Sequence, residues 1–278
     1  ATATVINIIG DLALVIVFHM GVAGVALATI LAMLISACLM IGTLARSRTC
    51  VRLRLSLMRV DPFILRQIFR MGIPAVVQMG ITSFSNIIVQ GYINQFGADV
   101  MSGWTAYAKI DALMLLPIQS IAVAVTTFVG QNIGSGKTER ARKGVYIASG
   151  ISVLITVVLS IPVMIFAPAL VGFFNAKPEV VAYGTMIIRW LTPFYFIAGT
   201  ANIQNSALRG SGDAKTPMIL TVLSYVVFRQ IYLYIMSHYI SNTLIPIAMG
   251  YPAGWIICVA ATMICFYRAD LGSKSVIR

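Results

Sequence analysis

Residues 21–45 read GVAGVALATILAMLISACLMIGTLA, and the chain continues from residue 46 with RSRTCVRLR. The first stretch contains no charged side chain, and at a rise of 1.5 Å per residue it would form a helix about 37 Å long. The hydrocarbon core of a bilayer is about 30 Å thick, so such a helix is long enough to cross it. The arginines that follow at once are typical of a membrane helix that ends on the cytoplasmic side.

The apolar pattern extends over the whole chain of 278 residues, of which 59% are hydrophobic and 10% charged, with a mean hydropathy of +0.91. Soluble domains are about 25% charged, so the surroundings of this chain are a lipid bilayer. We therefore predict an all-α fold, a polytopic transmembrane helix bundle of about eight spanning helices. The predicted spans are residues 1–18, 22–45, 74–96, 101–132, 145–167, 179–207, 216–238 and 243–267.

Lysine and arginine residues gather on one side of this predicted bundle. They occur between residues 46 and 70, between 137 and 143, at 209 and 215, and after 267, whereas the opposite side has Lys177 alone. Such asymmetry in short loops marks the cytoplasmic side. The formal charge of +12 is thus a topology signal, and we expect no nucleic acid as a partner. The sequence predicts a multi-pass protein of the plasma (inner) membrane with both chain ends in the cytoplasm.

The long basic loop contains one structured segment. Asp61-Pro62 is a typical helix start, and apolar residues then alternate with Arg66, Gln67 and Arg70 at helical spacing. We predict that residues 62–71 form an amphipathic helix that lies in the inner interface and connects two bundles.

Motifs of enzymes and of metal sites do not fit the sequence. The stretch Gly130 to Thr138 (GQNIGSGKT) is similar to a phosphate-binding loop, but five residues separate Gly130 from Gly136 where that motif needs four. The four cysteines form no CxxC pair and no cluster with histidine, so we expect no metal site. We find no catalytic constellation and predict that the protein is not an enzyme.

Five ionisable residues lie inside the predicted spans, and each costs at least about 2.5 kcal/mol at the bilayer centre. By helix rise they fall in one layer near the midplane. Lys109 and Asp111 are two residues apart and face nearly opposite ways. We therefore expect Asp111 to pair with Arg229 or Arg189, either as part of a transport pathway or as a structural ion pair. The five candidates are Asp11, Lys109, Asp111, Arg189 and Arg229.

Uncharged polar residues form stripes on two of the predicted spans. Asn86, Gln90 and Asn94 follow one another at intervals of four residues, and Asn202 and Asn205 lie three apart. Polar stripes in membrane helices face other helices or a water-filled cavity. We include these five residues among the candidates for a substrate or ion pathway. Pro117, Pro162, Pro193 and Pro252 are expected to interrupt their helices.

Several motifs, in order along the chain, resemble one family of transporters. They are Asn7 to Asp11 (NIIGD) with Gly21 to Thr29, Gly72-Ile73-Pro74 followed by Ile93 to Gly97 (INQFG), Lys109-Ile110-Asp111 with Leu116-Pro117, Gly130 to Gly134 (GQNIG), and Leu208 to Asp213 (LRGSGD). Together they are similar to helices five to twelve of the multidrug and toxic compound extrusion (MATE) family. The resemblance covers essentially the whole chain.

The resemblance implies twelve helices in two six-helix lobes, and export of organic cations and drugs in exchange for H⁺ or Na⁺ without a cofactor. We expect the chain to be a fragment, since Ala1 to Ile6 reads as the inside of a helix. Its parts would be residues 1–45 (the last two helices of the N-lobe), 46–71 (a basic linker) and 72–278 (the six-helix C-lobe). The missing helices of the N-lobe would be its partner.

Some members of the family carry coupling carboxylates on the seventh and tenth helices, but residues 74–96 and 182–207 contain no Asp or Glu. The resemblance therefore implies no sodium site of that type, and the coupling ion stays open between H⁺ and Na⁺. Two other functions also stay open. One is a flippase for lipid-linked precursors, which Lys109, Arg189 and Arg229 would suit, and the other is a membrane scaffold that transports nothing.

Overall fold

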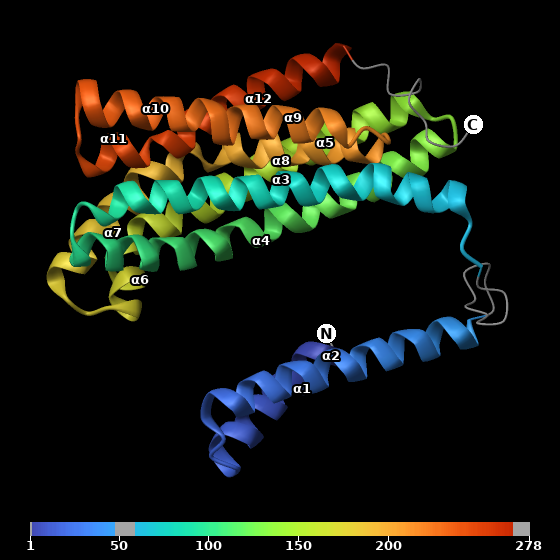
Figure 1. Cartoon of the computed structure of the whole chain (residues 1–278), viewed down its shortest axis with the longest axis horizontal. Coiled ribbons are helices and arrows are strands. Elements are labelled where there is room, and N and C mark those ends of the chain that lie inside the picture. The colour runs from blue at the N-terminus through green and yellow to red at the C-terminus, as the bar shows by residue number, and fades with distance from the viewer. Residues whose placement is uncertain (1, 48–58, 269–278) are drawn as a thin grey trace. The chain divides into compact units, whose positions relative to one another are not determined.

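The computed structural model describes residues 2–47 and 59–268, and every regular element within those ranges is a helix (Figure 1). The chain divides into two compact units, Ala1–Pro62 and Phe63–Arg278. Arg48, Arg52, Arg54, Lys274 and Arg278, which contribute to the predicted basic side, lie outside the described residues. The lobe boundaries at residues 45 and 71 stay predictions.

The first unit is a pair of helices. It consists of α1 (Thr2–Leu12), a π-helical turn η1 (Ala13–Val17) and α2 (Gly21–Arg46), which packs along α1. His19 has a positive φ of 52° in the turn between the two. The side chains of α2 are mostly exposed within this unit, as expected of a helix whose outer surface meets lipid.

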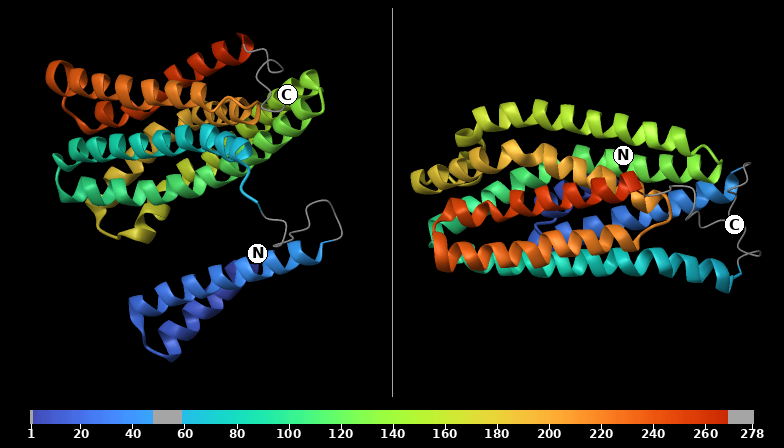
Figure 2. Two further views of the ribbon diagram at one scale, coloured as in Figure 1. Left: turned by 45° about the vertical axis from the view of Figure 1, so that its right-hand side comes forward. Right: turned by 90° about the horizontal axis from the view of Figure 1, so that it is seen from above.

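The second unit is a bundle of long helices that run side by side (Figures 1 and 2). Its elements are α3 (Pro62–Asn94), α4 (Ala98–Gly134), α5 (Thr138–Ile165), α6 (Ala167–Phe174), α7 (Pro178–Leu191), η3 (Thr192–Phe194), α8 (Tyr195–Gly210), α9 (Lys215–Val222), η4 (Leu223–Phe228), α10 (Arg229–Ile235), η5 (Met236–Ile240), α11 (Leu244–Ala248) and α12 (Gly250–Arg268). Because a bilayer offers no water, a spanning segment must satisfy its backbone internally, and these apolar sequences do so as helices.

Seven helical segments in the described residues are long and apolar enough to cross a membrane. They are Gly21–Arg46, Pro62–Asn94, Ala98–Gly134, Thr138–Ile165, Pro178–Gly210, Lys215–Ile240 and Leu244–Phe266, and the apolar segment Thr4–Val17 is shorter. The prediction of an all-α membrane bundle is confirmed. The helix predicted at residues 62–71 is present as the first part of α3 and runs into the span without a break. Its position in the interface stays a prediction.

The centre of the second unit is α4, which packs against α5, α7 and α8. Small residues allow the closest of these approaches. A Cβ atom on Gly103 of α4 would lie 2.9 Å from the backbone nitrogen of Gly184 on α7. Membrane helices associate largely through such close backbone contact, because lipid gives no hydrophobic drive between helices.

The prolines interrupt the helices less than the sequence suggests. Pro193 lies in η3 and separates α7 from α8, as predicted. Pro117 and Pro162 remain inside continuous helices, so the expected breaks there are wrong. Pro252 lies in the first turn of α12, just after the short helix α11. Long membrane helices tolerate proline because neighbouring groups satisfy the freed carbonyl.

The stretch with the phosphate-loop pattern is the end of α4. Gly134 is its last residue, Gly136 has a positive φ of 74° in the turn, and α5 begins at Thr138. The glycines therefore end a helix, where a left-handed residue is common.

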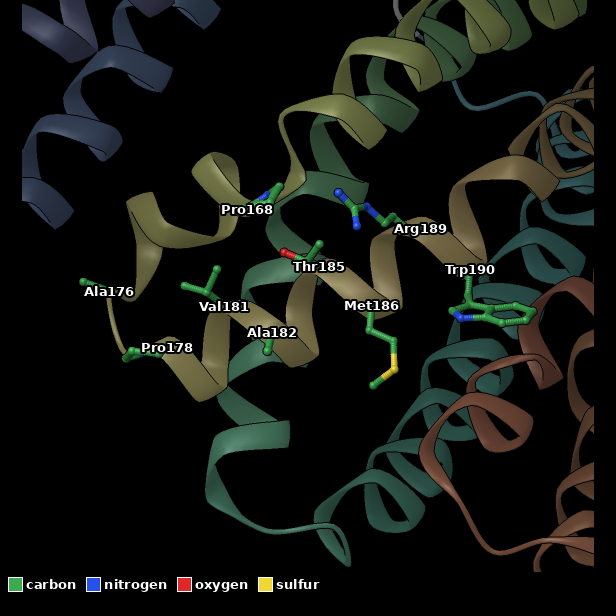
Figure 3. Close-up of a pocket in the computed structure, with 9 residues that line it drawn as sticks. All are labelled: Pro168, Ala176, Pro178, Val181, Ala182, Thr185, Met186, Arg189 and Trp190. Carbon is green, nitrogen blue, oxygen red and sulfur yellow. The ribbon is translucent and has the colours of Figure 1, made fainter.

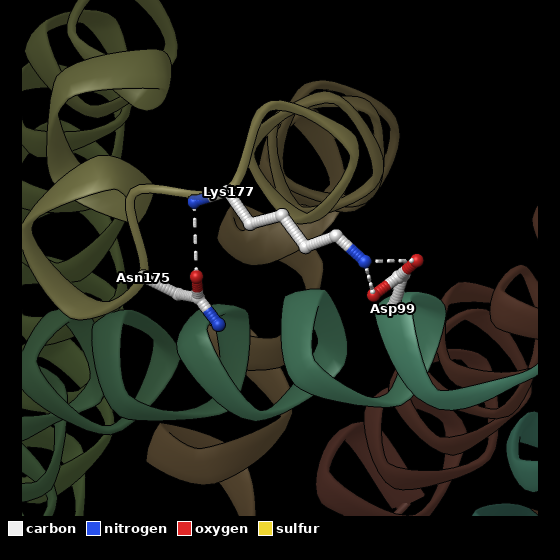
Figure 4. A network of polar contacts seen from close by, with 3 residues as sticks. All are labelled: Asp99, Asn175 and Lys177. Atoms are coloured by element: carbon white, nitrogen blue, oxygen red, sulfur yellow. Dashed lines mark hydrogen bonds and ion pairs between the residues drawn. The ribbon is translucent and has the colours of Figure 1, made fainter.

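An ion pair ties the start of α4 to the loop before α7 (Figure 4). The Lys177 ammonium lies 2.7 and 2.9 Å from the two carboxylate oxygens of Asp99, and the Lys177 backbone N–H donates to Asn175 Oδ1 at 3.0 Å. The hydrogen bond to Asp99 raises the pKa of Lys177, so its charge is kept throughout the neutral range. This contact fixes the α6–α7 turn against α4.

Candidate functional site

The most buried charge among the five candidates is that of Arg229, at the start of α10. Its side chain is 3% exposed. Nη2 donates to Ser85 Oγ at 2.7 Å and to Asn86 Oδ1 at 2.8 Å, both on α3. The neighbouring Gln230 donates from Nε2 to the same Ser85 Oγ at 2.8 Å. The guanidinium also lies over the ring of Tyr251, 4.7 Å from its centroid. We call Ser85, Asn86, Arg229, Gln230 and Tyr251 the arginine cluster.

The helix geometry before Arg229 is irregular. Residues 223–228 form the π-helical segment η4, and Ser85 Oγ donates to the Tyr225 carbonyl at 3.0 Å within it. Single π-helical turns inside α-helices are rare and often occur at functional sites. Here the irregular turn brings its backbone within reach of Ser85, so that α3 and α10 are joined by polar contacts inside an apolar bundle.

Aromatic rings connect Tyr251 to the middle of the bundle. Its ring centroid lies 5.7 Å from that of Trp104 and 6.3 Å from that of Trp255. Trp104 in turn lies 5.1 Å from Tyr107, and Trp255 lies 5.6 Å from Tyr195. The Tyr195 hydroxyl donates to the Tyr107 hydroxyl at 3.1 Å. Tilted and edge contacts at these spacings are favourable, and they form one aromatic layer.

Asp111, on α4, lies at the tyrosine end of this layer. Its carboxylate interacts with the Tyr195 hydroxyl. In the described part of the chain no ion pair joins Asp111 to Arg229 or Arg189, so the expected pairing is not formed in this structure. The physical reason is that neutral partners are available on the adjacent helices, a phenol for Asp111 and side-chain oxygens for Arg229.

Lys109 and Arg189 belong neither to the arginine cluster nor to the aromatic layer that ends near Asp111. Lys109 is exposed and its ammonium lies over the ring of Phe174, 5.0 Å from the centroid, so it faces away from Asp111 as expected. Arg189 is exposed at a surface pocket of about 770 Å³ and extends toward Pro168 (Figure 3). The pocket is lined by Pro168, Ala176, Pro178, Val181, Ala182, Thr185, Met186, Arg189 and Trp190.

The predicted stripe of Asn86, Gln90 and Asn94 lies on α3, and its part in a substrate or ion pathway stays a prediction. Asn86 and Asn94 are exposed within this unit, and Gln90 Nε2 donates to Asn94 Oδ1 at 3.1 Å. The two asparagines of α8 do not share one surface, because Asn202 is exposed and Asn205 is 5% exposed. Residues three apart on a helix differ in direction by about 300°, which is about 60° the other way round. Asn205 can therefore face the packed side while Asn202 faces outward.

Asp11 lies on α1, in the first unit. Asn7 and Asp11 are four residues apart on α1, and Asn7 Nδ2 donates to Thr29 Oγ1 on α2 at 3.3 Å. One Asp11 carboxylate oxygen is buried without a hydrogen-bond partner. An ionisable side chain with a buried, unpartnered oxygen inside an apolar helix pair is a candidate position on an ion or substrate pathway.

Comparison with known proteins identifies the family. The profile described as MatE matches residues 74–235, more than half of the chain. The chain belongs to the MatE family. It is 28% identical over 251 residues to the Probable multidrug resistance protein YpnP of Bacillus subtilis, covering 90% of this chain and 56% of that protein. It is 26% identical over 247 residues to the Probable multidrug resistance protein NorM of Thermotoga maritima, covering 87% and 50%.

Solved structures agree on the fold of this MatE chain. One, described as the outward-facing conformation of a multidrug resistance MATE family transporter of the MOP superfamily, has a TM-score of 0.88 at 21% identity and covers 96% of this chain and 60% of that one. A MOP superfamily transporter from Pyrococcus furiosus has a TM-score of 0.87 at 22% identity, covering 96% and 59%. The MatE chain spans about half the length of the curated relatives it matches. The two curated relatives are named as probable multidrug resistance proteins and the solved structure as a transporter, and none of the three names is that of an enzyme, in agreement with the sequence-based expectation.

Three members of the arginine cluster of this MatE chain were not among the sequence-based candidates. They are Ser85, Gln230 and Tyr251. Ser85 and Gln230 each stand directly beside a candidate, so their polar side chains in an apolar segment were the available signal. Tyr251 had no such signal, because tyrosine is common at the ends of membrane helices. Arg209, assigned to a loop, reaches back from α8 to Gln78 on α3 with a hydrogen bond of 2.8 Å.

Proposed function

We propose that the complete protein is a secondary active exporter of amphipathic organic compounds, with organic cations and drugs as the expected class, by alternating access. The observation that carries this proposal is the arginine cluster, in which a charge only 3% exposed is bound to the polar stripe of an apolar helix bundle. Buried charge is expensive in a membrane protein and is concentrated where ions or substrates pass. The named activities of the relatives point the same way.

We infer that H⁺ is the coupling ion and that Asp11 carries it. The Asp11 carboxylate has one buried oxygen without a partner, beside the hydrogen-bonded pair Asn7 and Thr29. An ionisable side chain inside a membrane span marks an ion or substrate pathway, and the unpartnered oxygen of Asp11 leaves room for a bound ion. Asp111, close to the Tyr195 hydroxyl, is the second carboxylate in this proposal, as a group that binds the proton or a cationic substrate.

The complete protein in proteoliposomes tests the proposal. A dye of the rhodamine class should leave the vesicles in response to a pH gradient and not in response to a Na⁺ gradient alone. Asp11→Asn should reduce the proton-driven rate at least about tenfold, because the amide cannot exchange a proton at neutral pH. The matched control is Asp99→Asn. The Asp99 carboxylate pairs with Lys177 in the exposed turn, so this variant should transport normally.

Asp111→Asn separates a transport role for that residue from a structural one. Reduced efflux by folded, membrane-inserted protein would support a transport role, whereas normal efflux would leave only a structural role. Efflux driven by Na⁺ with no effect of pH would overturn the assignment of H⁺. If no dye moved under any gradient, the scaffold function would be favoured.

A flippase for lipid-linked precursors is the second candidate. It is favoured by the cationic side chains Lys109, Arg189 and Arg229, which could accompany a phosphate group through the membrane. Lipid-linked sugar should then be translocated in the same vesicles while the dye remains inside. The reverse result would exclude the flippase.

We propose the plasma (inner) membrane as the location, with both ends of this chain in the cytoplasm. The support is the concentration of lysine and arginine on one side of the predicted spans. A membrane-impermeant thiol reagent applied to intact cells should not label a cysteine placed at Arg66, and labelling there would reverse the orientation.

A further inference from the structure

Arg229 has no anionic partner in the described part of the chain. Its hydrogen-bond acceptors, Ser85 Oγ and Asn86 Oδ1, are neutral oxygens, and its third contact is the face of the Tyr251 ring. A guanidinium has five N–H groups, of which the two on Nη2 are used, and Nε is buried without any partner. A full positive charge that is 3% exposed is therefore enclosed by neutral groups only.

Asn86 occupies the position that an anion would take. Its side chain is exposed on the outside of α3, at one end of the stripe with Gln90 and Asn94, and its amide oxygen points inward to Nη2. A hydrogen bond from a guanidinium to a carboxylate is charge-assisted and about twice as strong as one to a neutral amide. A carboxylate that reached this stripe would displace the Asn86 oxygen, since an exposed side chain is free to turn away.

Tyr251 fixes the orientation of the guanidinium. The ring lies under Arg229 at 4.7 Å, and stacking on an aromatic face holds the guanidinium plane while its edge stays available for hydrogen bonds. Planar edges of this kind match the two oxygens of a carboxylate. The aromatic layer that begins at Tyr251 continues through Trp104 and Trp255 toward Asp111. An aromatic ligand along this layer could therefore place a negative group at Arg229 and a positive group at Asp111.

We infer that Arg229 recognises the carboxylate of a zwitterionic, aromatic substrate, which displaces the amide of Asn86. The inference rests on the proposed function, because it assumes that the α3 stripe borders the transport pathway. It narrows the substrate class from organic cations to those that also carry a carboxylate.

The test uses two dyes that differ at one group, a rhodamine with a free carboxylate and its methyl ester. Binding to the purified complete protein in detergent is measured by fluorescence anisotropy. The wild type should bind the carboxylate dye more tightly than the ester. Arg229→Gln should weaken binding of the carboxylate dye about tenfold and leave the ester unchanged. Asn86→Ala should tighten binding of the carboxylate dye about threefold, because the competing oxygen is removed.

The opposite signs of the two variants distinguish recognition from a purely structural role, which would weaken binding of both dyes in both variants. Arg140→Gln, an exposed arginine on α5, is the matched control and should bind like the wild type. Equal losses for the two dyes, or no binding of the carboxylate dye by the wild type, would overturn the inference. Because binding in detergent needs no gradient, a protein that binds as expected but transports neither dye would contradict only the proposed function.

Discussion

Arg229→Met is expected to reduce efflux of the carboxylate dye at least about tenfold while leaving the unfolding temperature unchanged or higher. A buried cation costs several kcal/mol, and methionine fills similar space without charge. The variant leaves few groups unsatisfied, because Ser85 Oγ keeps its bonds to Gln230 and to the Tyr225 carbonyl, and Asn86 is exposed. Thermal unfolding and vesicle efflux are measured on the same preparation.

This combination of outcomes separates function from stability. Functional sites in proteins often hold groups that destabilise the fold, so removing one can raise stability at the expense of activity. Arg140→Met removes an exposed arginine and should change neither quantity. A large fall in the unfolding temperature of Arg229→Met, with efflux per folded molecule preserved, would identify Arg229 as a structural anchor between α3 and α10.

Gly103→Leu is expected to prevent the complete protein from folding. The new Cβ would lie 2.9 Å from the backbone nitrogen of Gly184 and 3.1 Å from the backbone oxygen of Val180. Backbone atoms cannot turn away as a side chain can, so α4 and α7 would have to separate at a cost of about 3 kcal/mol or more. The measurement is the yield of monodisperse protein after solubilisation, by size-exclusion chromatography.

Gly150→Leu provides the control for this variant. Gly150 is also a helical glycine, but a Cβ there would meet nothing within 4 Å, and the residue is exposed on α5. It should therefore give a normal yield, with its added side chain in the lipid. A monodisperse Gly103→Leu protein of normal yield would show that the close contact of α4 and α7 is dispensable.

The membrane fold could be predicted from the sequence because lipid leaves the chain few alternatives. A run such as residues 21–45 has no charge and must satisfy its backbone internally, which permits only a helix at that length. Proline residues predicted the ends of helices less well. Pro117 and Pro193 look alike in the sequence, yet only Pro193 ends a helix, because that outcome depends on neighbouring groups that no local pattern reveals.

The candidate site could be predicted in part. Arg229 and Asn86 were found because a charge or an amide inside an apolar span is costly and therefore informative. The contact between Arg229 and Asn86 could not be predicted, because the helix rise gives the depth of a residue along its own helix but not its neighbour on another helix. The same limit explains why the expected partner of Asp111 was wrong. Charge alone favoured an arginine, whereas the group beside Asp111 in the structure is the Tyr195 hydroxyl.

The central claim is that the stripe of α3 beside Arg229 borders a water-filled transport pathway. The most direct measurement is the labelling of single cysteines with a water-soluble thiol reagent, in membranes that contain the complete protein with its native cysteines replaced. Cysteines at Asn86, Gln90 and Asn94 should react and should be protected by the carboxylate dye. Cysteines at Phe84 and Ile88, exposed apolar positions away from the stripe, should stay unlabelled. Equal labelling on both faces, or none at the stripe, would contradict the account.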